Sequence, residues 1–139
     1  MRVIMRNKFT AGAIGIAAAA LFFSTTPAQA HHAFAAEFDD KKPIKLAGTV
    51  TKWELVNPHS WIHMDVKNPD GTVTAWTVEG GSPNALLRKG FTKNSLPEGT
   101  EIVVEGYQAK DGANRGVAAS LTYKDGKKVF LGSSAEDGK

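Results

Sequence analysis

The stretch "PIKLAGTVTKWELVNPHSWIHMDVKN" (43–68) decides the fold of this chain. Residues 43–56 are rich in β-branched and aromatic side chains and run into the turn signal Asn57-Pro58, which predicts a first strand. Residues 60–68 alternate between two kinds of side chain, which predicts a second strand with one apolar face. That face carries Ile62, Met64 and Val66, and the opposite face carries Trp61, His63 and Asp65.

A hairpin and a helix are predicted next. The turn "NPDG" joins the second strand to a third one at 72–80. The segment 82–90 then predicts a short helix, because Ser82 suits the N-cap, a proline follows it and a glycine stands just past the end. We expect Leu86 and Leu87 of this helix to pack on the end of the sheet.

Residues 100–109 and 116–123 predict strands four and five, and 127–132 predicts a short edge strand. This order of elements predicts a mostly β fold, namely a small five-stranded OB-fold-like Greek-key barrel with one short helix between strands three and four. A generic antiparallel α+β sheet gives the same order. A single domain would cover 31–132, followed by a flexible tail at 133–139.

Residues 1–30 have the three parts of a secretory signal peptide. A start with three basic residues precedes an apolar run, and the small-residue triplet "AQA" ends the segment. The apolar run is shorter than the roughly 20 residues that a membrane-spanning helix needs. Cleavage after the triplet would make His31 and His32 the first residues of the mature chain, ahead of an irregular lead through Phe34 and Phe38.

The net charge of +3 belongs to this leader. The chain has 17 basic and 14 acidic residues, and removal of the three basic ones in the leader leaves no net charge. A nucleic-acid-binding protein normally carries a basic surface, so no nucleic-acid partner is expected. There is no cysteine for a disulfide or a lipid anchor. We therefore expect a periplasmic or secreted protein with no membrane span after removal of the signal.

Two adjacent histidines at a free N-terminus are the most specific functional signal. The α-amine and the imidazole ring both offer nitrogen lone pairs near neutral pH, and Cu²⁺ favours nitrogen donors in a tetragonal arrangement. In one binding mode, the amine and ring of His31 bind the ion together with a distant histidine. In the other mode, the amine, the deprotonated amide of His32 and its ring bind it. The pair is also compatible with an accident of a flexible terminus.

His59 and His63 are the candidates for the distant ligand. On an extended strand their α-carbons would lie about 13 Å apart, near the limit for two rings on one ion. His59 is preferred, because its place in a loop gives it more freedom. Glu37, Asp39 and Asp40 are candidates for further ligands, although acidic residues in a lead segment are commonly just solvated.

Two loops would flank the ligand face of an OB-fold, those after strands one and four. Here they are "VNPHSW" and "KDGANR". Together with the strand face they supply the candidate ligand-binding residues Asn57, Trp61, Lys110, Asp111, Asn114 and Arg115. Residues of these types are also ordinary turn formers and solvated side chains. No local catalytic signature such as G-x-S-x-G is present, so no catalytic residue is predicted.

Several segments resemble a bacterial family of exported domains whose function is not established. They cover nearly all of 31–132 and are "HHAFAAEFD", "GTVTKWELVNPHSWIHMDV", "GSPNALLRKGF", "GTEIVVEGY" and "AKDGANR". The resemblance implies a small exported domain and supplies no catalytic residues.

The sequence thus predicts an exported, non-catalytic protein that binds a metal ion, with copper(II) favoured, through His31, His32, His59 and His63. The alternative is a metal-free OB-like module that binds a small ligand, a glycan or a protein partner through the loop and strand residues named above. An oxidative enzyme with a brace-like copper site is a third interpretation, for which the sequence offers no substrate cleft.

Overall fold

The structure, a computed structural model, describes residues 34–132. The predicted signal peptide, His31, His32 and the predicted tail at 133–139 lie outside the described residues. The described chain begins with a helical turn at 34–37. The elements that follow are β1 (Phe38–Leu55), β2 (Ser60–Lys67), β3 (Val73–Glu79), α2 (Pro83–Arg88), β4 (Glu101–Ala109), β5 (Arg115–Tyr123) and β6 (Lys128–Phe130).

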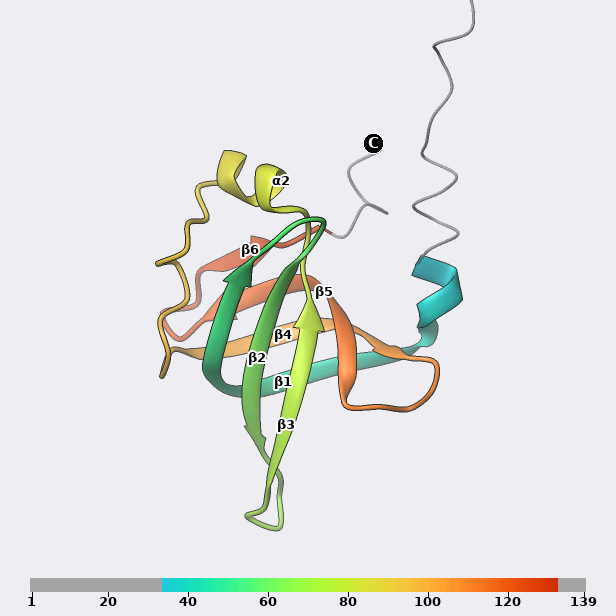
Figure 1. The fold of residues 1–139 in the computed structure, drawn as a ribbon. Helices are drawn as coiled ribbons and strands as arrows, with labels where there is room; N and C mark the ends of the chain where they lie inside the picture. The colour runs from blue at the N-terminus through green and yellow to red at the C-terminus, as the bar shows by residue number, and fades with distance from the viewer. Residues whose placement is uncertain (1–33, 133–139) are drawn as a thin grey trace, which may run out of the picture.

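The six strands form one sheet in the order β3-β2-β1-β4-β5-β6 (Figure 1). The neighbours in this order are antiparallel, and β3 pairs in addition with β5 in parallel, through Thr77 to Glu79. The predicted mostly β class is confirmed. The expected number of five strands is wrong by one, because residues 128–130 pair with β5 and so belong to the sheet.

Strand β1 is longer than predicted. It begins at Phe38, where an irregular lead was expected, and runs for 18 residues. Phe38 lies opposite Ala109 of β4, and the register shifts between Phe38 and Pro43 before regular pairing continues to Thr49. Residues 39–42 are polar, so this part of the strand lacks the alternation of apolar side chains by which a strand is predicted. The pairing of β1 with β4 forms the strand here instead.

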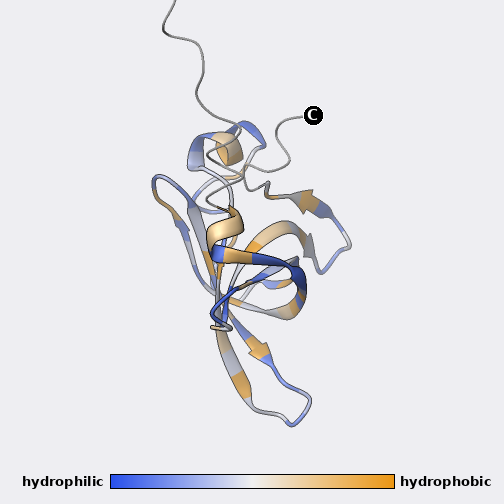
Figure 2. Ribbon diagram, turned by 90° about the vertical axis from the view of Figure 1, so that its right-hand side faces the viewer, coloured by the Kyte–Doolittle hydropathy of each residue, from blue (hydrophilic) through white to orange (hydrophobic). Residues whose placement is uncertain are grey.

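The main core fills the inner face of the sheet. Ile62 and Met64 are buried there, whereas Trp61 and His63, which alternate with them, are half-buried on the outer face, so the predicted alternation of this strand is confirmed. Figure 2 shows hydrophobic and hydrophilic residues alternating along the strands. The buried residues of this core are Leu46, Val50, Ile62, Met64, Val78, Leu86, Phe91, Leu96, Ile102, Val104, Ala118, Leu121 and Leu131.

The short helix α2 begins as the sequence predicts. The Ser82 hydroxyl accepts a hydrogen bond from the Ala85 amide at 3.3 Å, and Pro83 follows the cap. Leu86 is fully buried, but Leu87 is 51% exposed, so the expectation that both leucines pack on the sheet is wrong for Leu87. A helix of six residues turns only one narrow side toward the core. Within residues 34–132, no helix has both the length and the apolar character that crossing a membrane requires.

A second, smaller cluster holds the helical turn at 34–37 against the sheet. It contains buried Phe38, Ala109 and Val117, with Phe34 and Tyr107 packed on them. The Phe34 ring lies 5.9 Å from those of Phe38 and Tyr107 and meets the tyrosine edge to face, a favourable geometry for aromatic pairs. The start of the described chain is therefore anchored on β4 and β5.

Candidate functional site

A buried carboxylate stands at the end of β3. Glu79 is 7% exposed, although it lies in register with Trp61 of β2 and therefore belongs to the outer face. On its other side it lies opposite Val117 of β5, a member of the smaller cluster. The His59 ring contacts this carboxylate through Nδ1, a contact that is an ion pair only when the ring is protonated.

The environment of Glu79 has opposing effects on its protonation. Burial raises the pKa of this carboxyl above its ordinary value, because water no longer solvates the charge. His59 lowers the pKa, the Glu37 carboxylate raises it and the Arg115 guanidinium lowers it again. A buried charge needs such partners, so His59 and Arg115 are the two groups that make an ionised Glu79 tolerable.

Arg115 connects this carboxylate to the start of the described chain. Its Nη1 donates to Glu37 Oε2 at 3.3 Å, and its guanidinium carbon lies 5.6 Å from the centre of the Phe38 ring. The Lys110 amide donates to the Glu37 carbonyl at 2.9 Å, and the Lys110 ammonium donates to the Ala35 carbonyl. Figure 1 shows the helical turn beside the loop between β4 and β5. We call His59, Glu79, Arg115 and Glu37 the Glu79 cluster.

The backbone on both sides of Ser60 fixes the position of His59. The chain leaves β1 through exposed Val56 and a cis Asn57-Pro58 bond. The Ser60 amide then donates to the Gly81 carbonyl, and the Gly80 amide donates to the Ser60 carbonyl, both at 2.9 Å. His59 is thereby held next to the strand end that carries Glu79.

His63 occupies a different environment, although it lies only four residues from His59. Its Nε2 is 2.8 Å from Glu54 Oε2, and its Nδ1 is 3.3 Å from the Thr77 hydroxyl. Lys52 and, to a smaller extent, His63 lower the pKa of Glu54 by hydrogen bonding. Both ring nitrogens of His63 therefore have partners, whereas no residue of the described chain bonds His59 Nε2.

The other residues predicted for a site are dispersed. Trp61 is half-buried, and it lies opposite Glu54 of β1 on one side and opposite Glu79 of β3 on the other. Asn57, Lys110, Asp111 and Asn114 are exposed. Asp111 accepts from the Ala113 amide of its own loop, and the Asn114 carbonyl accepts from the Thr77 amide of β3. Within residues 34–132, no three histidine or acidic side chains are grouped closely enough to hold a metal ion.

Sequence reasoning did not single out Glu79. The alternation of β3 gives a usable signal, because Trp76 and Val78 pack in the core and place Thr77 and Glu79 on the outer face with Trp61 and His63. No local pattern predicts that Glu79 is buried. Its burial requires β5 and the residues around Phe38, which the fold brings next to it.

Ser60 follows His59 of the Glu79 cluster and carries a buried hydroxyl without a hydrogen-bond partner among the described residues. The residue is 0% exposed. We expect Ser60→Ala to leave the free energy of unfolding unchanged or raise it by up to about 1 kcal/mol, because an unpaired buried hydroxyl contributes only its desolvation cost.

Urea unfolding of Ser60→Ala checks this prediction, with Ser120→Ala as the matched control. Ser120 is also buried, but its hydroxyl donates to Glu105 Oε2 at 3.3 Å, so this variant should lose about 1 kcal/mol. A loss of more than 1 kcal/mol in Ser60→Ala would contradict the prediction and indicate that the hydroxyl is satisfied.

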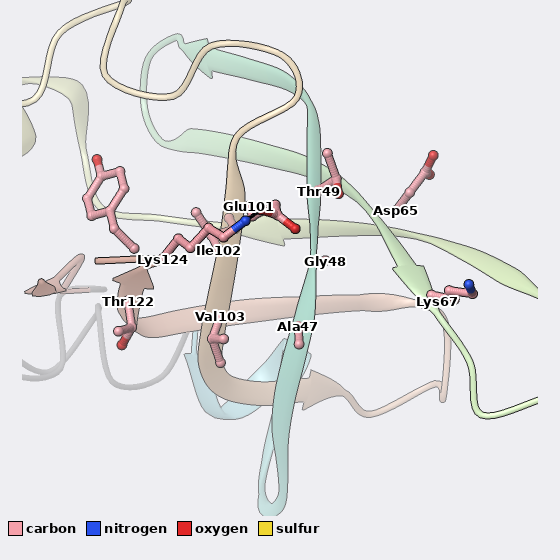
Figure 3. Close-up of a pocket in the computed structure, with 11 residues that line it drawn as sticks. Ala47, Gly48, Thr49, Asp65, Lys67, Glu101, Ile102, Val103, Thr122 and Lys124 are labelled. Atoms are coloured by element: carbon pink, nitrogen blue, oxygen red, sulfur yellow. Dashed lines mark hydrogen bonds and ion pairs between the residues drawn. The ribbon is translucent and has the colours of Figure 1, made fainter. Parts of the chain in front are cut away.

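A shallow hollow of about 420 Å³ lies elsewhere, across β1, β2, β4 and the end of β5. Its lining combines small and apolar residues with side chains of both charges, of which Lys124 and Glu101 form an ion pair (Figure 3). None of the residues predicted for a site lines it. The residues that line it are Ala47, Gly48, Thr49, Asp65, Lys67, Glu101, Ile102, Val103, Thr122, Tyr123 and Lys124.

The segments that build the Glu79 cluster all lie within one conserved sequence profile. Residues 19–119 match the profile of a family of unknown function (DUF6152). The chain belongs to this family. No curated protein matches the chain, and no solved structure does so either. The family has no assigned function, so membership of DUF6152 assigns no activity to this chain.

Proposed function

We propose that this chain is an exported, non-catalytic protein that binds Cu²⁺ through the free amine and the histidines of its processed N-terminus, His31 and His32, with His59 as the ligand from the folded domain. The observation that carries the proposal is the placement of His59. It has a ring nitrogen without a partner among the described residues, and it belongs to the cluster that contacts the N-terminal turn.

The reach of the N-terminal segment fits this arrangement. Glu37 bonds Arg115, and both act on the carboxylate that holds His59. Residues 34–37 form a helical turn that is held by Phe34, so the free segment is the three residues from Phe34 to His31, which at about 3.6 Å per residue span at most about 11 Å. The aromatic cluster under Phe34 fixes one end of this short segment, which lowers the entropic cost of bringing its histidines to a fixed partner.

The donor set suits copper better than a hard cation. A terminal amine and imidazole nitrogens are the ligand types that Cu²⁺ prefers, whereas Ca²⁺ and Mg²⁺ require several oxygen ligands. His63 is a weaker candidate than His59, because Glu54 and Thr77 engage both of its ring nitrogens.

The finer fold assignment supports the same location. The pairing of β3 with β5, added to the order β3-β2-β1-β4-β5, supports the proposal of an OB-fold-like Greek-key barrel. In that fold the loops after strands one and four flank the usual ligand face. Those loops carry His59 and lead into Arg115, the two residues that lower the pKa of Glu79.

Copper titration of the processed chain tests the proposal, with a variant that carries one extra residue before His31 as the comparison. We expect the processed chain to bind one Cu²⁺, with nitrogen hyperfine structure in electron paramagnetic resonance. The extended variant should lose tight binding, because the added residue moves the amine away from the His31 ring and puts the His32 chelate out of register.

The melting temperature without metal should be the same in both chains, which separates loss of a ligand from loss of fold. Equal copper affinity in the two chains would remove the terminal amine from the site. Weak, non-stoichiometric binding to both would favour the metal-free alternative, in which the outer face around Trp61 and Arg115 binds a small ligand, a glycan or a protein.

A further inference from the structure

The ring of His59 meets Glu79 through one nitrogen only. A neutral imidazole carries one N–H donor and one lone pair, and an ionised carboxylate can only accept. The contact between Nδ1 and the Glu79 carboxylate therefore places the hydrogen on Nδ1. The lone pair is then on Nε2, the nitrogen without a partner among residues 34–132.

Glu79 is fixed well enough to impose this choice. Its backbone lies between β2 and β5, opposite Trp61 on one side and Val117 on the other. It is 7% exposed, whereas the side chain of His59 is 44% exposed. The buried carboxylate is thus the rigid member of the pair, and the more exposed ring takes its orientation from it.

Arg115 supports this carboxylate, and Glu37 holds Arg115 in place. Arg115 stabilises a negative charge on Glu79, and Glu37 in turn binds Arg115. The order from the chain start to the ring is therefore Glu37, Arg115, Glu79 and His59, with the positive Arg115 between two carboxylates.

From this geometry we infer that Glu79 is a positioning residue, which holds His59 in the Nδ1–H tautomer and presents Nε2 to a metal ion. A carboxylate behind a metal-binding histidine fixes the tautomer and the ring orientation and makes the ligand more basic. The role in metal binding rests on the proposed function, whereas the tautomer is a property of the metal-free chain. His63 serves as an internal contrast, because its contacts run through Nε2 to Glu54 and leave no free nitrogen.

The first measurement is the tautomer of His59 in the metal-free processed chain. Long-range ¹H–¹⁵N spectra at alkaline pH, where imidazole is neutral, distinguish the protonated from the bare nitrogen. We expect the Nδ1–H form in the native chain and in Glu79→Gln, whose amide oxygen still accepts from Nδ1. We expect Glu79→Leu to lose this form. An Nε2–H tautomer in the native chain would overturn the inference, whatever copper does.

The second measurement is copper affinity in the same variants. Glu79→Leu should bind Cu²⁺ about 10–100-fold more weakly, the usual effect of losing a partner behind a metal ligand, and Glu79→Gln should recover most of that loss. Glu54→Leu removes the partner of His63 in the same way and should leave the affinity unchanged. If Glu79→Leu bound as tightly as the native chain, the positioning role would be wrong.

The two proposals can fail separately. If the native chain shows the Nδ1–H tautomer but binds no copper, the proposed function is overturned and the effect of Glu79 on His59 stands. Melting curves without metal verify that each variant folds, and if Glu79→Leu does not fold, the native tautomer together with Glu79→Gln still decides the inference.

Discussion

Gly106→Ala is expected to destabilise the domain by more than about 3 kcal/mol, a large part of the 5–15 kcal/mol that a domain of this size has. Gly106 lies in β4, where the register with β5 shifts between Glu105 and Gly106. A β-carbon at this position would stand 1.8 Å from the Val117 carbonyl oxygen and 2.9 Å from the carbonyl carbon. Backbone atoms of a paired strand cannot move aside like a flexible side chain, so β4 and β5 would have to separate.

Gly71→Ala is the matched control for this prediction. Gly71 has a φ of +88°, but nothing lies within 4 Å of its β-carbon position, so the same substitution tests backbone strain without a clash. The left-handed conformation costs a non-glycine residue about 1–2 kcal/mol. Chemical unfolding of both variants gives the comparison. A loss in Gly106→Ala no larger than that in Gly71→Ala would show that the two strands relax around the added methyl group.

His59→Ala is expected to weaken copper binding by at least about 100-fold, more than the loss of a partner behind a ligand costs. The reason is that the variant removes the one nitrogen donor that the Glu79 cluster offers. It also leaves the buried Glu79 carboxylate without the ring N–H that contacts it, so the metal-free melting temperature should fall as well. Competition titration against a chelator of known affinity measures the change.

His63→Ala is the control within the same strand face. His63 is bonded to Glu54 and Thr77, and its removal should change the copper affinity by less than about threefold. Its partly exposed pair with Glu54 contributes little to stability, because solvent screens the interaction. If the two variants exchanged roles, so that only His63→Ala lost copper, the assignment of the ligand would be reversed.

The parts of the fold that the sequence predicts correctly are those with local causes. The side chains of 60–67 alternate because successive residues of a strand point to opposite faces, and Ser82 begins α2 because its hydroxyl accepts from the Ala85 amide. Neither effect needs any distant part of the chain. The sixth strand was expected only as an edge segment, because three residues carry too little pattern to indicate a partner.

The parts that sequence analysis misses depend on distant contacts. The lead before Pro43 becomes a helical turn and the first residues of β1 because Phe34 and Phe38 pack with Tyr107 of β4. Their spacing of four residues, which places two side chains on one side of a helical turn, was the available signal. Glu79 is similar, because its burial depends on the approach of β5. Copper binding by the terminal histidines remains a prediction.

The pairing of β1 with β4 also bears on how the chain reaches this fold. Phe38 lies opposite Ala109, and Thr49 lies opposite Glu101, so one of the two neighbours of the first strand comes from the second half of the sequence. Contacts between residues far apart along a chain slow folding, because a large loop must close before they form. The β2–β3 hairpin is local, but β1 and the Glu79 cluster require β4 and β5. An emerging N-terminal half therefore cannot assemble the cluster, and the domain gains its site only when nearly all of its chain is present.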